Sequence, residues 1–309
     1  MKSDNPPIKH HYIPAFYLSQ WAVSGSKLVE YAKVHGGKIV AKRKGPEATG
    51  FQDRLYEMKG FDPENAQQFE EKYFKPVDTA AAEALGLLKS YGHAAPWTSK
   101  NKSGWTMFIM SLLLRCPEDI EAFRDWWHED FGRTTLEVER DYQAKRKPTD
   151  PATFSQFLVA QPLKKKEEYM FETLKSLLAH DSVGRKISEM QWRVLETPAS
   201  APPLLTSDRP LLRTQSLEAE RGHIALPIGP RLLFIASPDP RFLADTLRAD
   251  QTRLVKELNL QVVESAVRFV FAADESQTRF IKNRFSNSPQ TRLIEQIIGR
   301  QRSADSPFS

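Results

Sequence analysis

The feature that most constrains the fold is a long central stretch, residues 62–183, in which apolar side chains recur at helical spacing. Phe69 and Tyr73 are four residues apart, and so are Met170 and Leu174 near the other end of the stretch. Side chains three and four positions apart share one face of an α-helix. The middle of the chain is therefore predicted to be a set of amphipathic helices.

Strand patterns lie on both sides of this helical middle. Residues 27–32 and 38–42 flank Gly36-Gly37, a pair that accepts the positive φ of a tight hairpin turn. After the helical stretch, residues 191–195 alternate polar and apolar side chains, and residues 268–272 are also strand-like. These patterns predict an α+β fold, mainly helical, with a mostly antiparallel sheet built from N-terminal and C-terminal strands around the helical middle.

No internal repeat is visible, and no linker of proline, glycine and serine is long enough to separate two domains. We therefore predict a single α+β domain over residues 1–286. The C-terminal tail, residues 287–309, is predicted to carry one short helix.

The chain has one cysteine, Cys116, which excludes an internal disulfide and any cysteine-based metal cluster. The first residues lack the apolar segment of a secretory signal. The most apolar run, from Trp105 to Leu114, has ten residues, whereas a membrane helix needs about twenty. A cytoplasmic protein with no membrane partner is the expectation.

Charge and motifs narrow the functional classes. The net charge of +5 favours an anionic partner such as nucleic acid, although the basic runs at 42–44, 145–147 and 164–166 are short and lie among acidic residues. The chain has no phosphate-binding glycine loop, no nucleophile elbow and no His-Glu-x-x-His helix. Nucleotide-dependent transfer, common serine hydrolysis and zincin proteolysis thus lose their usual support.

The most distinctive segment runs from Lys9 to Leu18 and contains His10, His11 and Pro14. Histidine titrates near neutral pH, so either imidazole is a candidate general base. Adjacent residues of an extended chain point to opposite sides, which predicts that one histidine faces a pocket while the other packs. In the alternative interpretation, one histidine anchors backbone carbonyls and the other lies in solvent.

Two further residues are candidates for catalysis. Arg115 ends a nearly apolar helix and would need a carboxylate or phosphate partner near the core, unless it pairs with Glu118 or Asp119 at the helix terminus. Asp208 follows an apolar strand, where a carboxylate can orient a histidine or bind a cation. The alternative for Asp208 is a turn in which its carboxylate accepts a backbone N–H.

A pair of acidic residues, Glu70 and Glu71, belongs to the first predicted helix. The neighbouring side chains of Phe69 and Tyr73 are predicted to face inward. One of the two carboxylates is therefore expected near the buried boundary and the other in water. Either one can also pair with Lys75.

Polar side chains in or next to these motifs are candidates for substrate binding. An amide, hydroxyls and a guanidinium in these positions offer the donors and acceptors that a polar substrate requires. The candidates are Gln52, Tyr12, Thr206, Ser207 and Arg209.

The segment Lys9-His10-His11-Tyr12-Ile13-Pro14-Ala15-Phe16-Tyr17-Leu18 resembles the start of an uncharacterised bacterial family, domain of unknown function 4238. Arg209 departs from the family pattern, which often has a small polar residue at that position. The family has no activity to carry over, but the resemblance implies that His10, His11 and Asp208 belong together. Further similar motifs, within a match over residues 9–273, are Gln191-Trp192, Leu205 to Pro210, Leu226 to Pro230, and Asn259 leading to Ala266-Val267-Arg268.

Two functions are compatible with these residues. In the first, a nuclease-like phosphodiester hydrolase associated with defence or toxicity uses His10 or His11 to activate the nucleophile. Asp208 orients that histidine or holds a divalent cation, Mg²⁺ or Mn²⁺, and Arg115 stabilises charge on the phosphate. In the second, the chain is a non-catalytic module that binds nucleic acid or protein. The residue pattern predicts neither a metal ligand set nor an oligomeric state.

Overall fold

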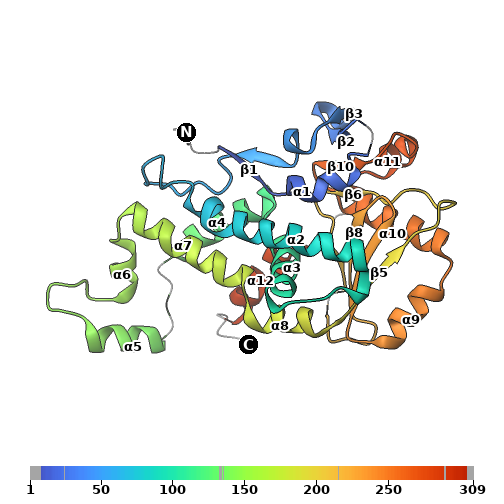
Figure 1. Ribbon diagram of the computed structural model, residues 1–309. Helices are drawn as coiled ribbons and strands as arrows, with labels where there is room; N and C mark the ends of the chain where they lie inside the picture. The colour runs from blue at the N-terminus through green and yellow to red at the C-terminus, as the bar shows by residue number, and fades with distance from the viewer. Residues whose placement is uncertain are drawn as a thin grey trace.

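The fold is α+β, with helices through the middle and antiparallel strands contributed by both halves of the chain (Figure 1). This confirms the predicted fold class. The computed structural model describes residues 8–23, 25–131, 134, 136–214, 216–288 and 290–304.

The predicted pairing of N-terminal with C-terminal strands is present in one four-stranded sheet, with the order β3-β2-β10-β6. The single sheet expected from the sequence is replaced, within the described ranges, by three separate ones. Strands β5, β9, β8 and β7 pair with each other in a second sheet, because β8 and β9 form a hairpin and β5 joins its free edge. The third is the two-stranded ribbon β1-β4. The strands are β1 (Lys9–His11), β2 (Leu28–Lys33), β3 (Ile39–Lys44), β4 (Phe51–Asp53), β5 (Gln191–Glu196), β6 (Thr206–Ser207), β7 (Leu212–Arg213), β8 (Ile224–Gly229), β9 (Leu232–Ser237) and β10 (Phe269–Ala272).

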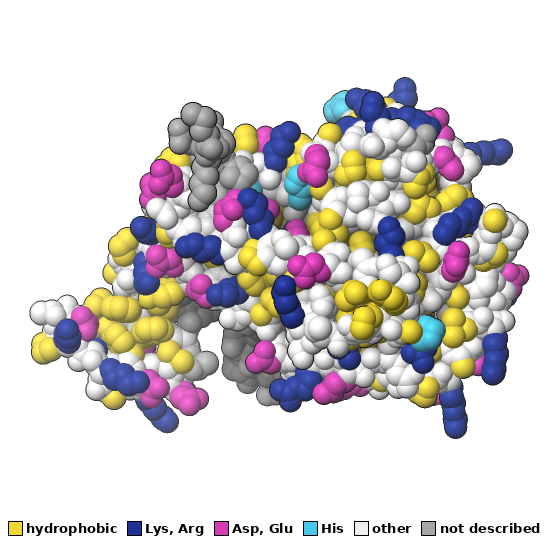
Figure 2. Space-filling view, viewed as in Figure 1, with side chains coloured by type: hydrophobic (Ala, Val, Ile, Leu, Met, Phe, Trp, Pro, Cys, Tyr) yellow, Lys and Arg dark blue, Asp and Glu magenta, His cyan; other side chains and the backbone are white. Residues whose placement is uncertain are grey.

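The helices of the middle pack beside the sheets, and α5 with α6 projects from the body as an arm (Figures 1 and 2). In this part of the molecule α2 and α3 pack against each other, and α8 and α7 both contact α3. The C-terminal tail carries the predicted short helix, α12, which contacts α4. The helices are α1 (Ala15–Leu18), α2 (Lys75–Tyr91), α3 (Ser99–Ser111), α4 (Pro117–Asp130), α5 (Leu136–Lys145), α6 (Phe154–Val159), α7 (Leu163–Leu178), α8 (Asp181–Glu189), α9 (Pro240–Arg248), α10 (Gln251–Ser265), α11 (Thr278–Arg284) and α12 (Leu293–Ala304).

The start of the first long helix differs from the sequence prediction. In the sequence, Asp62-Pro63-Glu64 predicts a helix start and Pro76 predicts a kink. In the structure, residues 63–67 form turns and Glu70–Phe74 is a π-helix that runs into α2. Pro76 has no N–H to donate to the carbonyl four residues earlier. The wider π-turn lies directly before this gap in the hydrogen-bond ladder, and single π-turns are frequent at functional sites.

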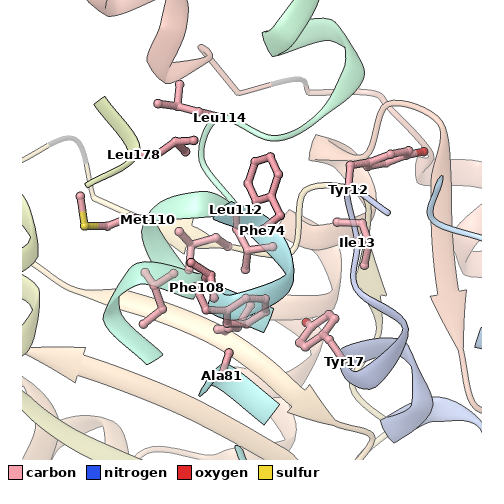
Figure 3. Close-up of a cluster of buried hydrophobic side chains, with 14 of the residues drawn as sticks. Tyr12, Ile13, Tyr17, Phe74, Ala81, Phe108, Met110, Leu112, Leu114 and Leu178 are labelled. Atoms are coloured by element: carbon pink, nitrogen blue, oxygen red, sulfur yellow. The ribbon is translucent and has the colours of Figure 1, made fainter. Parts of the chain in front are cut away.

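The main core joins the N-terminal segment to these helices. Figure 3 shows Ile13 and Tyr17 of the first segment beside Phe74 and Phe108 of the helical middle. The rings of Tyr17 and Phe108 have centroids 5.9 Å apart. Tyr17 also bonds to the C-terminal half, because its hydroxyl donates to the Pro227 carbonyl at 2.6 Å. The opening segment therefore fastens both halves of the fold together.

Among the described helices, none is both long and apolar enough to cross a membrane.

Candidate functional site

The segment with the two histidines is held by β-pairing and by one glycine. His10 pairs with Gln52 and His11 with Phe51 in the β1-β4 ribbon. Directly after the ribbon, the carbonyl of Gly50 accepts the N–H groups of Tyr12 and Ile13 at 2.9 and 3.0 Å. Gly50 has φ +69°, and a Cβ there would lie 2.8 Å from the Ile13 carbonyl oxygen. Only glycine fits this close approach without a shift of the backbone.

His10 is fully buried and engages the residues that follow β4. Its ring stacks on Tyr56 with centroids 5.5 Å apart, and its Nδ1 accepts the Tyr56 backbone N–H at 2.8 Å. An accepting Nδ1 places the proton of the neutral ring on Nε2. The hydroxyl of Tyr56 in turn donates to the Arg115 carbonyl at 2.6 Å. His10 thus orders the turn that connects the ribbon to Arg115.

His11 projects from the opposite face of the ribbon, where its ring is tilted against Phe51 at a centroid distance of 5.5 Å. The residue is half-buried, and its Nε2 has no hydrogen-bond partner among the described residues. Burial lowers the pKa of His11 below its ordinary 6.5, Glu47 acts in the opposite direction, and Arg115 lowers it further. The imidazole is therefore neutral at pH 7 and has a nitrogen available for a proton.

Arg115 lies at the centre of the cluster and is fully buried. Its two terminal nitrogens donate to the two carboxylate oxygens of Asp78 at 2.8 and 3.1 Å, and one of them also donates to the His11 carbonyl at 2.8 Å. The guanidinium stacks over Phe74 at 4.4 Å. Pro117, the first residue of α4, favours an extended Cys116 and so separates α3 from α4. Arg115 therefore sits in the short connection between two helices, beside the histidine segment.

Glu70 approaches the same pair from the π-helix. It is 6% exposed, and its Oε2 has no hydrogen-bond partner among the residues described. Burial raises the pKa of Glu70 to about 7, against the opposing effect of Arg115. Gln67 and Tyr73, on the same stretch of chain, each also have a buried side-chain oxygen without a partner in the described ranges. Orphaned buried polar atoms are uncommon in folded proteins and call for an explanation.

Asp208 is buried in a different arrangement. Its two carboxylate oxygens accept backbone N–H groups of Val267, Arg268 and Phe269 at 3.0, 2.5 and 3.2 Å. Burial raises the pKa of Asp208 to about 6, although these hydrogen bonds act to lower it. The carboxylate thus secures the start of β10, as the alternative interpretation of a backbone-capping aspartate describes, but across the fold rather than within its own turn.

A chain of contacts connects Asp208 with Arg115. Cys116, the residue after Arg115, donates its thiol to the Asp208 carbonyl at 3.0 Å. The main chain therefore brings His11, Arg115 and Asp208 into one region. The side chains of Arg115 and Asp208 are directed at different partners, Asp78 and the β10 backbone respectively.

The predicted substrate-binding residues divide by burial. Tyr12, Thr206 and Ser207 are buried, with Thr206 bonded to the Tyr17 hydroxyl at 2.8 Å. The guanidinium of Arg209 pairs with Asp119 at 3.2 Å. Gln52 is half-buried, and its side-chain oxygen accepts from Arg268 at 2.8 Å. Of this set, Arg209 lines a small hollow of about 30 Å³, and Gln52 lines a larger cleft.

That cleft, with a volume of about 480 Å³, lies between β4 and α4. Besides Gln52, its walls carry four cations, two carboxylates and one histidine: Arg54, Lys59, Arg124, Arg268, Glu121, Asp125 and His128. Arg54, Arg124 and Arg268 pair with Glu57, Glu167 and Glu118, whereas Lys59 has no ion pair among the described residues and is available to an anionic ligand.

The residues that sequence reasoning missed are Asp78, Gln67 and Tyr73. Asp78 gave no local signal, because it is 37 positions from the arginine that it binds. One carboxylate of the Glu70–Glu71 pair was expected near the buried boundary, and the structure places Glu70 there. In the described part of the chain, no group of three or more His, Cys, Asp and Glu residues could hold a metal ion.

Comparison with known proteins identifies the family. A search of curated proteins and a search of solved structures returned no match. The family model described as protein of unknown function (DUF4238) matches residues 9–276, which include the histidine segment, Arg115 and Asp208. The match covers most of the chain, and the protein belongs to the DUF4238 family.

Proposed function

We propose that the protein hydrolyses phosphodiester bonds by general acid–base catalysis, with His11 as the base and Glu70 as the acid. One observation carries the proposal. Two titratable groups, His11 and Glu70, have pKa values that burial moves in opposite directions, and both interact electrostatically with the Arg115–Asp78 pair. A neutral imidazole and a partly protonated carboxyl group at pH 7 are the protonation states that such a reaction requires.

The reaction step uses these two states. A water oxygen attacks phosphorus and passes a proton to His11 Nε2, while the bond from phosphorus to the leaving oxygen breaks. The carboxyl group of Glu70 gives its proton to that oxygen, so the products are a phosphate monoester and an alcohol. Arg115 is a positioning residue, because its terminal nitrogens hold Asp78 and the His11 carbonyl.

The choice of an anionic substrate rests on the charges around the pair. Arg115 acts electrostatically on both His11 and Glu70, Lys9 acts on His11, and Lys75 acts on Glu70, whereas the carboxylates of Glu47, Asp78 and Glu71 act in the opposite direction. The cations among these charges can stabilise the negative charge that develops on phosphate in the transition state.

Hydrolysis of labelled RNA and DNA strands, single and double, with and without Mg²⁺ or Mn²⁺, tests the proposal. His11→Gln and Glu70→Gln should each lower kcat by about 10²-fold or more. The exposed His35 and the neighbouring Glu71 provide matched controls, so His35→Gln and Glu71→Gln should cleave like the wild type. Equal cleavage by all four variants, or none by the wild type, would reject the assignment.

The pH profile offers an independent test. His11 must be neutral and Glu70 protonated, so kcat should rise with pH on the acidic side and fall again near pH 7. Glu70→Gln should remove the fall near pH 7 from the residual activity. A profile that is flat from pH 5 to pH 9 would contradict the assigned roles.

A second candidate, nucleic-acid binding without catalysis, is favoured by the cleft between β4 and α4. In that case Arg54→Ala with Lys59→Ala should weaken binding of a labelled oligonucleotide, measured by fluorescence anisotropy. The paired change Lys33→Ala with Lys38→Ala, on the exposed β2–β3 hairpin, removes the same charge outside the cleft. Equal affinity of the two double variants for the oligonucleotide would contradict nucleic-acid binding in the cleft.

The cytosol remains the proposed location, and the single cysteine supports it.

A further inference from the structure

A groove of about 760 Å³ lies between α10 and α11, on the side of the molecule drawn at the right of Figure 1. Apolar atoms form most of its surface, and its apolar lining residues are Phe280, Leu260 and Pro202. Pockets for small ligands have volumes of about 300–1,000 Å³ and mostly apolar walls with a few polar groups. The groove has the size and the wall of a ligand pocket.

The polar side of this groove is strongly basic. Arg253 and Lys256 come from α10, and Arg279 and Arg284 from α11, whereas Glu257 is the one carboxylate among its lining residues. Arg253 and Arg284, the first and last of these four cations along the chain, each lie next to a carboxylate. Arg253 pairs with Glu257 at 2.8 Å, and Arg284 lies 3.5 Å from Glu264.

The two inner cations remain available. Lys256 and Arg279 are exposed, and neither has an ion pair among the residues that the structure describes. They stand on opposite helices and line the same groove. Two such cations facing one volume are suited to a ligand that carries several negative charges.

The wall between the helices is held in place by a buried amide. The Asn259 side chain accepts the Leu205 N–H at 2.8 Å and donates to the Pro203 carbonyl at 2.9 Å and to Gln277 at 3.0 Å. Gln277 donates to the same Pro203 carbonyl at 2.7 Å. These bonds tie α10 to the residue that precedes α11. The groove is thus formed before any ligand binds, which lowers the entropic cost of binding.

We infer that the groove between α10 and α11 binds a free nucleoside polyphosphate, with the base against Phe280 and the phosphates against Lys256 and Arg279. An aromatic ring stacks on any nucleobase, and cations on facing helices match a compact chain of phosphates. The four basic residues line a single groove of limited volume, which favours a small ligand over a long strand. The site shares no residue with the His11–Glu70 cluster and does not depend on hydrolysis.

Isothermal titration calorimetry with ATP, GTP, adenosine and inorganic triphosphate tests the inference. Lys256→Ala with Arg279→Ala should weaken ATP binding by about tenfold or more, because both phosphate contacts are lost. The control, Arg241→Ala with Lys282→Ala, removes two exposed cations outside the groove and should change the affinity less than about twofold.

Phe280→Leu separates the base contact from the charge. The Phe280 ring packs partly against the second core, and leucine preserves much of that contact. This variant should lower the affinity for ATP and leave the affinity for inorganic triphosphate unchanged.

Three outcomes would overturn the inference. These are no nucleotide binding by the wild type at millimolar concentration, equal affinities of the two double variants, and tighter binding of a single-stranded oligonucleotide than of ATP at the same residues. Calorimetry on His11→Gln keeps the result separate from any loss of cleavage, because that variant retains the whole groove.

Discussion

Two buried carboxylates, Glu70 and Asp208, have pKa values raised by the same cause and differ in what surrounds them. Burial raises the pKa of Glu70 to about 7 and that of Asp208 to about 6. Both oxygens of Asp208 accept backbone N–H groups, three in all. Glu70 has an oxygen without a partner among the described residues.

The difference separates structural from chemical roles. A buried carboxylate whose oxygens accept backbone N–H groups stabilises the folded state, and its removal leaves those N–H groups unpaired. A buried carboxylate with a vacant oxygen contributes little to the fold and is available to exchange a proton. By this criterion Asp208 is the structural member of the pair and Glu70 the candidate for catalysis.

The largest effect is expected at Asp208. Asp208→Ala leaves the N–H groups of Val267, Arg268 and Phe269 without their acceptor and should lower the free energy of unfolding by about 3–5 kcal/mol. Urea denaturation followed by circular dichroism measures this change. Asp208→Asn keeps one acceptor oxygen and should lose less. If Asp208→Ala lowered the free energy of unfolding by less than 1 kcal/mol, Asp208 would not have the structural role assigned to it.

The next effect concerns the ion pair between Arg115 and Asp78. Asp78→Asn leaves the fully buried Arg115 guanidinium without its counter-charge and should cost about 3 kcal/mol. Glu71→Gln breaks a solvent-exposed pair with Lys75 and should stay within about 0.5 kcal/mol. Comparable losses from both variants, measured by the same denaturation, would mean that burial does not distinguish the two pairs.

Much of the fold follows from sequence patterns that are local. The helical middle, the hairpin at Gly36-Gly37 and the helix in the C-terminal tail each rest on periodicity or turn chemistry within a few residues. Pairing between β2 and β10 was also expected, since both ends of the chain carry strands. The division into several sheets was not, because the edge on which a strand pairs is decided by contacts far apart in sequence.

The candidate site was only partly visible for the same reason. The sequence pointed to His11 and Arg115, and the structure places them in one cluster. It gave no sign of Asp78, whose role exists only once α2 packs against the connection after α3. The π-turn that carries Glu70 also depends on the missing N–H donor at Pro76, a residue that predicts only a kink when the sequence is taken alone.

The pH dependence of stability sharpens the comparison at Glu70. A raised pKa means that, between pH 4.5 and about 7, the folded state holds a proton that the unfolded state has lost. Stability from this group is therefore present below pH 4.5 and decreases as the pH rises to about 7. Relative to Glu70→Gln, the wild type should lose up to about 3 kcal/mol across that window. A constant difference from pH 4.5 to pH 7.5, in urea titrations, would place the Glu70 pKa near its ordinary value.

The smallest effect tests the same criterion on two buried tyrosines. The Tyr17 hydroxyl bonds to Thr206 and to the Pro227 carbonyl, whereas the Tyr73 hydroxyl has no partner among the described residues. Tyr17→Phe should therefore cost about 1–2 kcal/mol, because it leaves two buried groups unpaired, and Tyr73→Phe should stay within about 0.5 kcal/mol. Thermal and urea denaturation of both variants measures the difference. If Tyr73→Phe cost as much as Tyr17→Phe, its hydroxyl would have a partner in the folded protein, and an unpaired oxygen would no longer distinguish the Glu70 region from the Asp208 region.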